Sequence, residues 1–464
     1  MMLSFLTKES PQSRSHRLVR PVIKKGNGIY LVKLPLQWTV QLANPEAIRT
    51  VLMRTDKFPK SLGLLKTLGD NSPFTRFFGF RNIAVTNGDE WKQQRKLMSP
   101  VFHRSMPVQL FGNVMTKVFR NIDASDGTVA VPDLMQRLTL DVIGLSAFGF
   151  DFNALDEARS EWLTTYEVVR EGIRSPIPLL IPRLDKYVHY FSSGRRRIMA
   201  AVDKLNGLLL DMAERKREQL IQNAMEQKEE HEKDLLTLLL EAERRGEGEA
   251  SNEFLRSNLA IFFLAGHDTT ANALSFCIYH LALYKDIQRK AREEVLKVLG
   301  DEPIDVFPSI QECKRMQYID NIIKENLRVA GPASMLGPRV ADEDVMLGDT
   351  LIPKGTPISI DIYNTHHNPA VWEDPDRFLP ERFEEGGEYS KNTNGLSWIP
   401  FSQGGRICIA MNFSLAEQRV SMAMLLRKYE WDIPEDSIHK NGIKLDHFQP
   451  VAPASLKINF RRRY

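Results

Sequence analysis

Hydrophobic periodicity divides the chain into a short strand-forming start and a long helical body. From Gly28 the segment "GIYLVKLPLQWTVQLANPEAIRTVL" predicts two strands, followed by a helix that begins near Asn44 with proline in its first turn. Strand signals return only between Val345 and Ile362, where "LGDT" and "PKGT" mark turns between short β-branched runs. The pattern predicts a mainly α-helical fold with a small β-sheet region.

Apolar residues recur at helical spacing through much of the remaining chain. The predicted helices are Asp133 to Phe148, Arg195 to Leu220, Asp234 to Glu243, Asn252 to Tyr284, Ile310 to Val329 and Ser414 to Lys428. No Gly/Ser linker, repeat or low-complexity tract divides the 464 residues, so we expect a single large domain.

Charge and cysteine content narrow the classes of protein. A net charge of +3, without Lys/Arg blocks interleaved with aromatics, argues against a nucleic-acid partner. Cys277, Cys313 and Cys408 are odd in number and far apart, which argues against a disulfide framework and against a zinc site, and favours a reducing compartment. The longest apolar run, Leu259 to Gly266, is shorter than the ~20 residues of a membrane span, and "MMLSFL" is too short for a signal peptide. We therefore expect no transmembrane anchor in this chain.

The long predicted helix contains "AGHDTT", residues 265 to 270, which is unusual for a helix interior. Glycine alone costs up to ~1 kcal/mol there relative to alanine. One interpretation is a tolerated packing defect. The alternative is a functional opening, in which Gly266 admits a bulky planar group close to the backbone and Thr269 diverts hydrogen bonds from the helical ladder. Asp268 would then be a neighbouring source of protons.

The segment "FSQGGRICIA", Phe401 to Ala410, surrounds Cys408 with two glycines and an arginine. A thiolate needs positive potential and N–H donors to persist near neutral pH, and a helix N-terminus supplies both. The apolar pattern predicts such a helix directly after Cys408. Glycines allow left-handed turns, and Arg406 is long enough to contact an anionic group of a ligand. A lone cysteine is usually an inert buried residue, but this frame favours a metal-binding thiolate.

The same segment closely resembles the haem-binding loop F-x-x-G-x-R-x-C-x-G of the cytochrome P450 superfamily, and the other family motifs occur in the expected order. They are "WKQQR" (Trp91 to Arg95), "TLDVIGLSAFGFDF" (Thr139 to Phe152), "AGHDTT", "ENLR" (Glu325 to Arg328) and "PERF" (Pro380 to Phe383). The resemblance implies the P450 fold over residues 28–464, with the haem between the long central helix and the helix after the cysteine. Residues 1–27 would be an N-terminal segment without an anchor helix.

The sequence departs from the family pattern at three places. Ala410 stands where glycine usually follows the cysteine. "RVAGP", starting at Arg328, replaces the common R-x-x-P-P, and this weakens the match to the family pattern in the segment that leads to Arg339, the expected haem-propionate contact. The chain also begins roughly where the proline-rich hinge of eukaryotic members ends.

The resemblance assigns roles to individual residues. Cys408 is the expected metal ligand, Thr269 is expected to hold oxygen and water by hydrogen bonds, and Asp268 to relay protons, whereas His267 is expected to be an ordinary helix residue. The expected cofactor contacts are Cys408, Arg406, Trp91, Arg95, Arg339, Gly404, Phe401 and Ala265. Glu325, Arg328 and Arg382 are expected to form a buried structural network; an exposed ion pair worth ~0.2–0.5 kcal/mol is the alternative for Glu325 and Arg328.

The same comparison implies an apolar substrate. The residues expected to line its pocket are Phe262, Leu264, Ala265, Ala333, Met335 and Phe448. Phe74 to Phe80, "FTRFFGF", would roof this pocket, although plain packing also explains it. Ser175 to Pro182, "SPIPLLIP", is not expected to be regular helix because of its prolines, and would be either a membrane-dipping loop or a buried loop.

The expected activity is that of a haem-thiolate monooxygenase, which inserts one atom of O2 into an apolar organic substrate by hydroxylation or epoxidation. The cofactor would be haem b (iron protoporphyrin IX), and electrons would come from NADPH through a separate flavoprotein reductase. Lys92 and Lys96 would dock that reductase or form an ordinary solvated surface. The alternatives are an isomerase or dehydratase acting on peroxides, and a haem sensor or carrier. We expect peripheral contact with the cytosolic side of the endoplasmic reticulum membrane, with a soluble cytoplasmic protein as the alternative.

Overall fold

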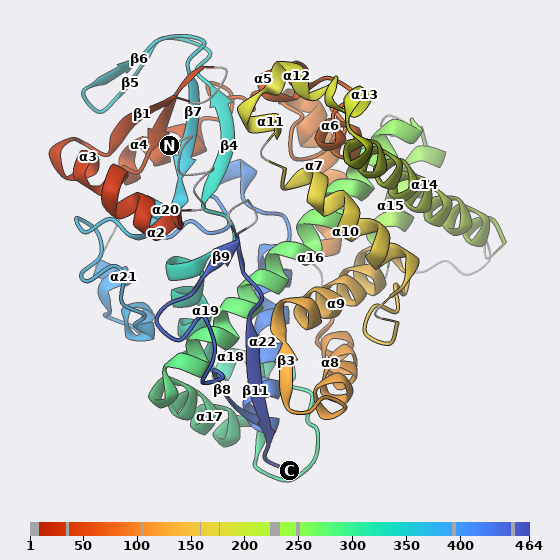
Figure 1. The fold of residues 1–464 in the computed structure, drawn as a ribbon, viewed down its shortest axis with the longest axis vertical. Helices are drawn as coiled ribbons and strands as arrows, with labels where there is room; N and C mark the ends of the chain where they lie inside the picture. The colour runs from red at the N-terminus through yellow and green to blue at the C-terminus, as the bar shows by residue number, and fades with distance from the viewer. Residues whose placement is uncertain are drawn as a thin grey trace.

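The structure is a computed structural model that describes residues 9–33, 37–103, 106–157, 159–175, 177–222, 233–246, 251–391, 396–446 and 451–464. A large helical body carries a four-stranded sheet at one corner, where the N-terminal helices also lie (Figure 1). The mainly α-helical prediction with a small sheet region is therefore confirmed.

The N-terminal part forms helices and strands that pack around that sheet. Its elements are α2 (Pro11–Arg14), the π-helix η1 (Ser15–Val19), α3 (Arg20–Lys25), β1 (Ile29–Lys33), β2 (Trp38–Leu42), α4 (Pro45–Met53), α5 (Gly63–Leu68) and α6 (Pro73–Phe78). The predicted helix after Gly28 begins as expected, because the Asn44 side chain accepts hydrogen bonds from the backbone N–H groups of Glu46 and Ala47, each at 3.0 Å. The domain boundary at residue 28 stays a prediction, although Arg20 already pairs with Asp376 of the main body.

The helical body follows, with one helix through its centre. Its elements are α7 (Gly88–His103), α8 (Val108–Asp123), α9 (Val131–Ile143), the π-helix η2 (Gly144–Phe148), α10 (Glu161–Ile173), α11 (Ile177–Leu180), α12 (Pro182–Asp185), α13 (Val188–Phe191), α14 (Ser193–Gln222), α15 (Leu235–Arg244), α16 (Asn252–Leu283), α17 (Lys285–Leu299), α18 (Ile310–Arg315) and α19 (Gln317–Ala330). The central helix α16 has 32 residues and, at 1.5 Å per residue, spans about 48 Å. The interpretation of "AGHDTT" as part of one long helix is confirmed.

The C-terminal part returns to the sheet and then supplies the cysteine loop. Its elements are β4 (Met335–Val340), β5 (Val345–Leu347), β6 (Thr350–Ile352), β7 (Pro357–Asp361), α20 (Ile362–His366), the 3-10 helix η4 (Pro380–Phe383), α21 (Glu388–Lys391), the 3-10 helix η5 (Gly404–Arg406), α22 (Met411–Lys428), β8 (Tyr429–Asp432), β9 (Leu445–Asp446), β10 (Ala452–Pro453) and β11 (Lys457–Arg462).

Four small sheets are formed by the described strands. The largest has the order β1-β2-β7-β4, in which only β2 and β7 run parallel, and β4 carries an irregularity between Leu336 and Arg339. The others are β3 (Thr128–Ala130) with β11 and β8, the β5-β6 hairpin, and the β9-β10 pair. The prediction that strands return only between Val345 and Ile362 is therefore wrong.

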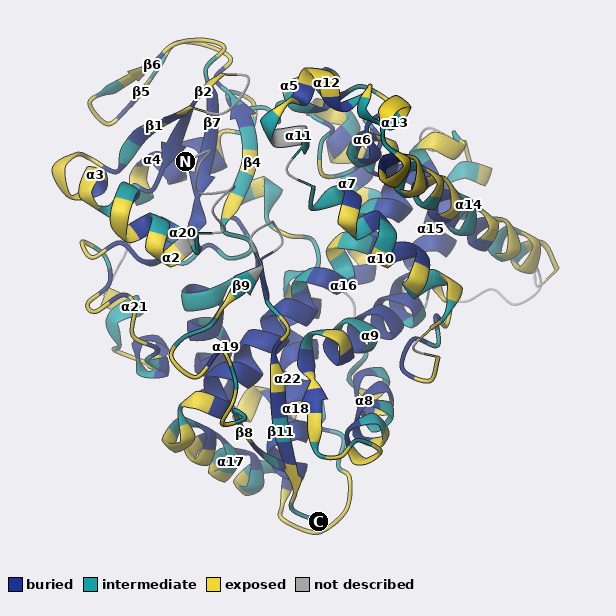
Figure 2. Ribbon diagram, viewed as in Figure 1, coloured by how far each residue is buried: buried dark blue, intermediate teal, exposed yellow. Residues whose placement is uncertain are grey.

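The main hydrophobic core surrounds the central helix, and a second, smaller core lies under the four-stranded sheet (Figure 2). None of the helices within the described ranges is both long and apolar enough to cross a lipid bilayer. The expectation that Ser175 to Pro182 avoids regular helix is wrong in part, because α11 forms there and Pro182 begins α12. Proline is tolerated in the first turn, where its missing N–H needs no helical partner.

Candidate functional site

Cys408 lies three residues before the first residue of α22, so the prediction of a helix just after the cysteine is confirmed. Its backbone N–H donates to the Phe401 carbonyl at 2.9 Å, which closes the loop. The side chain has accessible surface although it lies deep in the fold. Burial raises the pKa of the thiol, whereas the backbone N–H of Ala410 and the Arg95 guanidinium lower it. The two lowering contacts are those that a thiolate requires.

Glycine at position 404 is required by its surroundings. Gly404 has a φ of +70°, and a β-carbon there would lie 2.7 Å from the Leu52 carbonyl oxygen of α4. Gly405 leaves its β side facing the Trp91 ring, whose nearest atom would be 3.5 Å from an added β-carbon. The loop therefore packs between α4 and α7, and its backbone path depends on Gly404.

Four cationic side chains gather beside this loop: Lys60, Arg95, Arg339 and Arg406. The Arg406 guanidinium stacks 3.9 Å above the Trp91 ring and donates to the Thr86 carbonyl at 2.6 Å. Arg95 donates to the Ile407 carbonyl at 2.7 Å, and Arg339 to the Phe58 carbonyl at 3.0 Å.

The charges of this cluster are not balanced by acidic neighbours. Burial, together with Arg339 and Arg95, lowers the pKa of Arg406 to about 10, and burial, Arg339 and Arg406 lower the pKa of Lys60 to about 7. Within the part of the chain that the structure describes, no carboxylate pairs with any of the four, and the Nε and Nη1 atoms of Arg406 are buried without a hydrogen-bond partner. Such a cluster is suited to an anionic ligand. Lys60 was not predicted from the sequence.

The Ala265–Thr270 segment of α16 lies close to the start of α22. The Thr270 hydroxyl is 2.9 Å from the Ser414 hydroxyl of α22. Ala265 is exposed, and the Thr269 hydroxyl, one helical turn further along the same face, donates to the Ala265 carbonyl at 2.8 Å. The sequence predicted that Thr269 would form a hydrogen bond of this kind with the helix backbone. The helix nevertheless continues through this position.

Gly266 lies where α16 crosses α9. A β-carbon at this position would lie 2.7 Å from Ile143 Cγ1 of α9. The glycine therefore allows the two helices to cross closely, which agrees with the packing interpretation; the admission of a planar ligand stays a prediction.

Asp268 is buried and faces α9 and α10. The Tyr166 hydroxyl donates to its Oδ2 at 2.6 Å, and the Gln136 amide lies 3.4 Å from its Oδ1. Arg170 of α10 in turn donates to the Gln136 carbonyl oxygen at 2.7 Å. Asp268 and Thr269 are neighbours in sequence, but their side chains have different partners. Tyr166 and Gln136 were not found from the sequence, because they lie 102 and 132 residues before Asp268.

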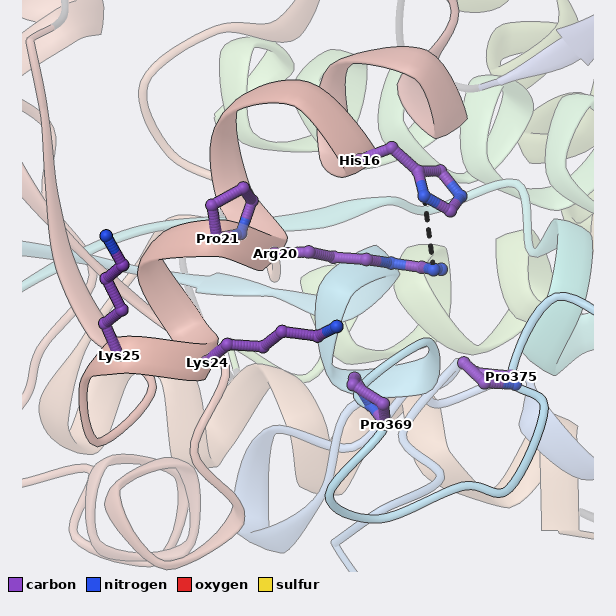
Figure 3. Close-up of a pocket in the computed structure, with 7 residues that line it drawn as sticks. All are labelled: His16, Arg20, Pro21, Lys24, Lys25, Pro369 and Pro375. Atoms are coloured by element: carbon purple, nitrogen blue, oxygen red, sulfur yellow. Dashed lines mark hydrogen bonds between the residues drawn. The ribbon is translucent and has the colours of Figure 1, made fainter.

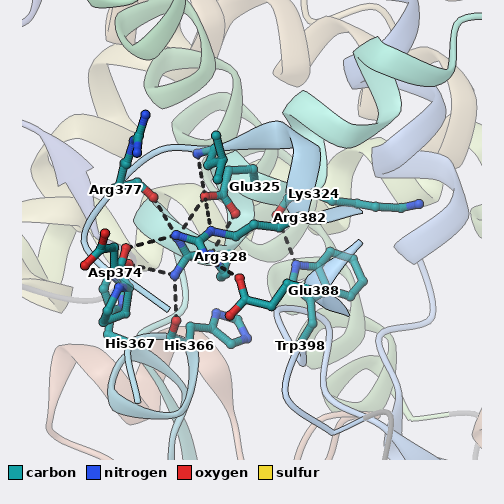
Figure 4. Close-up of polar contacts among 12 residues, drawn as sticks. Lys324, Glu325, Arg328, His366, His367, Asp374, Arg377, Arg382, Glu388 and Trp398 are labelled. Atoms are coloured by element: carbon teal, nitrogen blue, oxygen red, sulfur yellow. Dashed lines mark hydrogen bonds and ion pairs between the residues drawn. The ribbon is translucent and has the colours of Figure 1, made fainter. Parts of the chain in front are cut away.

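Glu325, Arg328 and Arg382 form a buried network, as expected, so the surface-pair alternative is wrong (Figure 4). Arg328 pairs with both carboxylate oxygens of Glu325, at 2.7 and 2.8 Å, and Arg382 lies 3.4 Å from the same carboxylate. Burial raises the pKa of Glu325, and the two guanidinium groups oppose that rise.

The network continues toward the cysteine loop. Arg328 donates to the His366 carbonyl at 2.8 Å, and the His366 ring accepts from the Ile399 backbone N–H at 2.8 Å. Ile399 lies two residues before Phe401, whose carbonyl accepts the hydrogen bond from the Cys408 backbone N–H. The network is therefore placed to fix the position of the loop.

Comparisons with known proteins agree with this architecture. The sequence profile of the cytochrome P450 family matches residues 1–458. The chain belongs to the cytochrome P450 family. Among its relatives, human cytochrome P450 3A5 is 27% identical over 94% of this chain and 84% of its own length, and rat cytochrome P450 4F5 is 31% identical over 76% and 69%. Protein LUTEIN DEFICIENT 5, chloroplastic, of Arabidopsis thaliana is 29% identical. The matched region covers 76% of this chain and 60% of the length of that protein.

Membership in the cytochrome P450 family makes the chain a haem-thiolate monooxygenase, an oxidoreductase whose metal is the iron of the haem. The fold described above is the cytochrome P450 fold. Its long central helix carries "AGHDTT", the cysteine loop carries "FSQGGRICIA", and the other family motifs lie on α7, α9, α19 and η4.

The residues expected to line the P450 substrate pocket have mixed surroundings. Phe262 is buried and stacks on Phe102 of α7 at 5.6 Å, whereas Leu264 and Ala333 are partly exposed and Met335 is 40% exposed. Phe448 lies outside the described residues. Of the expected roof, Phe77 is fully buried, while Phe74, Phe78 and Phe80 are partly exposed.

Proposed function

We propose that this cytochrome P450 hydroxylates or epoxidises an apolar organic substrate with electrons from a separate NADPH-dependent flavoprotein reductase. The observation that carries the proposal is the accessible Cys408 thiol in front of α22, beside a cation cluster that has no carboxylate partner among the described residues. The haem, when bound, supplies the activation of O2, and the protein supplies the ligand, the protons and the substrate site.

The residues fit haem b. Its two propionates are carboxylates, and the cation cluster offers Arg95, Arg339, Arg406 and Lys60 to them, with the orphaned Arg406 Nε and Nη1 atoms as donors. Trp91, Gly404, Phe401 and Ala265 are the proposed apolar and backbone contacts. Cys408 is the proposed axial ligand, supported by the N–H of Ala410 and by Arg95.

We assign proton delivery to Asp268 and Thr269. The Thr269 hydroxyl is on the accessible face of α16 and donates to the Ala265 carbonyl, so with haem present it would be a hydrogen-bond donor on the haem side of this helix. Asp268 lies behind this face as the proposed proton source; Gln136 contacts its carboxylate and is itself held by Arg170, so these two side chains would orient the carboxylate.

We further propose peripheral membrane contact through the exposed apolar residues of α12 and α13. Phe191 is 88% exposed and Tyr190 62%, and both belong to α13, which lies at the upper edge in Figure 2. The cleft of about 530 Å³ between α3 and the prolines 369 and 375 is lined by Arg20, Lys24 and Lys25 and suits anionic head groups (Figure 3). Phe191→Asp should reduce co-flotation with vesicles that mimic the endoplasmic reticulum. Equal flotation of the variant and the parent would refute this contact.

The test of the function is a binding screen followed by a turnover assay. Steroids, fatty acids, terpenes and small aromatics are added to the haem protein, and a shift of the haem absorption band identifies ligands. A ligand is then incubated with reductase, NADPH and isotopically labelled O2. One labelled oxygen atom in the product supports the proposal. Turnover of a peroxide without NADPH would instead indicate an isomerase or dehydratase, and binding without turnover a sensor.

A further inference from the structure

A cavity of about 170 Å³ lies outside the proposed haem site, at the C-terminal half of α16. Its walls come from α16, the end of α19, α20 and the segments on both sides of residues 447–450, which include β9 (Figure 1). Seven of its nineteen lining residues carry aromatic rings: Phe276, Tyr279, His280, Tyr284, Tyr363, His367 and Phe378. An apolar protein cavity of about 150 Å³ is known to hold benzene, so this volume suits a single aromatic ring.

The aromatic walls are arranged as parallel stacks. The His280 and Phe378 rings lie 4.5 Å apart at 17°, and the Tyr284 and Phe378 rings 5.5 Å apart at 10°. On the wall formed by α20, Tyr363 stacks on His367 at 4.1 Å and 17°. These stacks are contacts among the wall residues themselves, so they hold the rings in fixed orientations around the cavity. A flat ligand would extend them, because offset stacking adds about 0.5–1.5 kcal/mol to the gain from burial.

The hydrogen bonds of His280 fix which of its ring nitrogens can bind a ligand. The Asn326 amide nitrogen donates to the Ala273 carbonyl, so Asn326 Oδ1 is an acceptor, and His280 Nδ1, at 2.9 Å, must be its donor. Burial lowers the pKa of His280 to about 4, so the ring is neutral at pH 7 and its Nε2 is an acceptor. No donor to Nε2 is found in the described part of the chain.

His367 has the same arrangement. Its Nδ1 donates to the Tyr363 carbonyl at 2.8 Å, and burial lowers its pKa to about 3, so its Nε2 is also an acceptor. The Asp376 carboxylate at the rim pairs with Arg20. The cavity therefore offers hydrogen-bond acceptors between aromatic faces, which favours a neutral donor and disfavours an anion.

We propose that this aromatic slot binds a small neutral phenol, with its ring against Phe378 and its hydroxyl donating to Nε2 of His280. The site is independent of the haem chemistry proposed above. Its occupant would contact Ile443 and Val451, and the Val451 backbone N–H donates to the Pro332 carbonyl at 2.8 Å, directly before Ala333.

Fluorine NMR of para-fluorophenol with the haem protein tests the site. An azole bound to the haem iron is present in every sample, so that binding at the haem is excluded. We expect saturable binding to the parent protein, and at least tenfold weaker binding of para-fluoroanisole, which has the same ring but no hydroxyl donor. Equal affinity for the two probes would overturn the assigned hydrogen bond to His280.

Two substitutions at the rim separate the slot from other surfaces. Leu283 lines the cavity and is 38% exposed, so its replacement disturbs the core little. Leu283→Trp should fill the entrance and weaken para-fluorophenol at least tenfold, whereas Leu283→Ala, the matched control, should retain binding. His280→Phe should keep the stack on Phe378 but lose the preference for the phenol over the anisole. Unchanged binding to Leu283→Trp would overturn the proposal.

Discussion

Replacing Arg328 by lysine tests whether the buried network holds the cysteine loop. Arg328 donates five hydrogen bonds, two to Glu325 and one each to the carbonyls of His366, Pro375 and Arg377. A lysine ammonium has three donors on one point, so at least two of these buried acceptors lose their partner.

The cost follows from that count. Each buried acceptor left without a donor costs about 1–3 kcal/mol, so we expect Arg328→Lys to lower the free energy of unfolding by about 2–6 kcal/mol. Because a domain is stable by about 5–15 kcal/mol, the substitution removes a large share of the total. The charge is conserved, so the loss reports hydrogen-bond geometry.

Urea unfolding of the haem protein, followed by tryptophan fluorescence, measures this change. Arg289→Lys is the matched control, because Arg289 is an exposed arginine of α17 that pairs with Glu293 at 3.2 Å and with Asp286 at 3.5 Å. We expect a change within about 0.5 kcal/mol for the control. A loss below about 1 kcal/mol in Arg328→Lys, similar to that of the control, would refute the structural role of the network.

Three further predictions concern the haem and its partners. Cys408→Ser should abolish the red-shifted absorption band of the reduced carbon monoxide complex. Cys277→Ser and Cys313→Ser should retain the band, because burial raises the pKa of those two thiols to about 12 and about 11. A normal band in Cys408→Ser would exclude Cys408 as the ligand. Thr269→Ala should still consume NADPH but release more peroxide and less product, and unchanged coupling would remove Thr269 from proton delivery. Lys92 and Lys96 are exposed on α7, the helix that carries Arg95. The double substitution Lys92→Glu with Lys96→Glu should slow reductase-driven turnover at low salt and leave peroxide-driven turnover nearly unchanged. Equal loss in both assays would indicate a damaged haem site.

The long helices were predictable from the sequence because each buries an apolar face that recurs at helical spacing, although the last residues of α14, after Ala213, are not buried. One predicted helix, Ile310 to Val329, is in fact two helices that meet at Met316. The second begins where the Glu294 carboxylate of α17 accepts from the backbone N–H groups of Tyr318 and Ile319, at 2.8 and 2.9 Å. A helix N-terminus satisfied from another helix leaves no local capping signal in the sequence.

The missed strands have a similar cause. β4 reads "MLGPRV" and β11 "KINFRR", so glycine, proline and charges interrupt the alternation that marks a strand. Both form because they pair with partner strands, β7 for β4 and both β3 and β8 for β11. Such pairing is a property of the tertiary structure, and the local pattern does not encode it.

The haem loop and its motifs were predictable because they are local in sequence, but the surroundings of the motif residues were not. Tyr166 holds Asp268 across 102 residues of chain, and the crossing of α9 against Gly266 depends on Ile143. Lys60 is brought to Arg339 by an isolated bridge between the two backbones, next to a four-stranded sheet. No spacing rule connects such residues before the chain is folded.

Lys60 leads to a prediction about pH. Burial, Arg339 and Arg406 lower its pKa to about 7, below the ordinary lysine value of about 10.4, so the unfolded chain binds more protons than the folded apoprotein between these values. The stability of the apoprotein should therefore rise with pH above about 7. Over two pH units, one proton bound only by the unfolded chain changes the free energy of unfolding by at most ~2.7 kcal/mol. Because the Lys60 side chain is partly exposed, we expect a rise of about 1–2 kcal/mol in the free energy of unfolding between pH 7 and pH 9.

Lys60→Met, which removes the charge and keeps an unbranched side chain one atom shorter, separates this effect from other titrations. The variant apoprotein should be more stable than the parent at pH 6, because a repulsive charge is gone, and its stability should rise less between pH 7 and pH 9. If Lys60 contacts a haem propionate, the same variant should release haem faster to a haem-binding acceptor protein, most clearly near pH 6, where the lysine is charged. Parallel stability profiles of the parent and Lys60→Met would show that Lys60 titrates outside this range, and would remove it from the cation cluster.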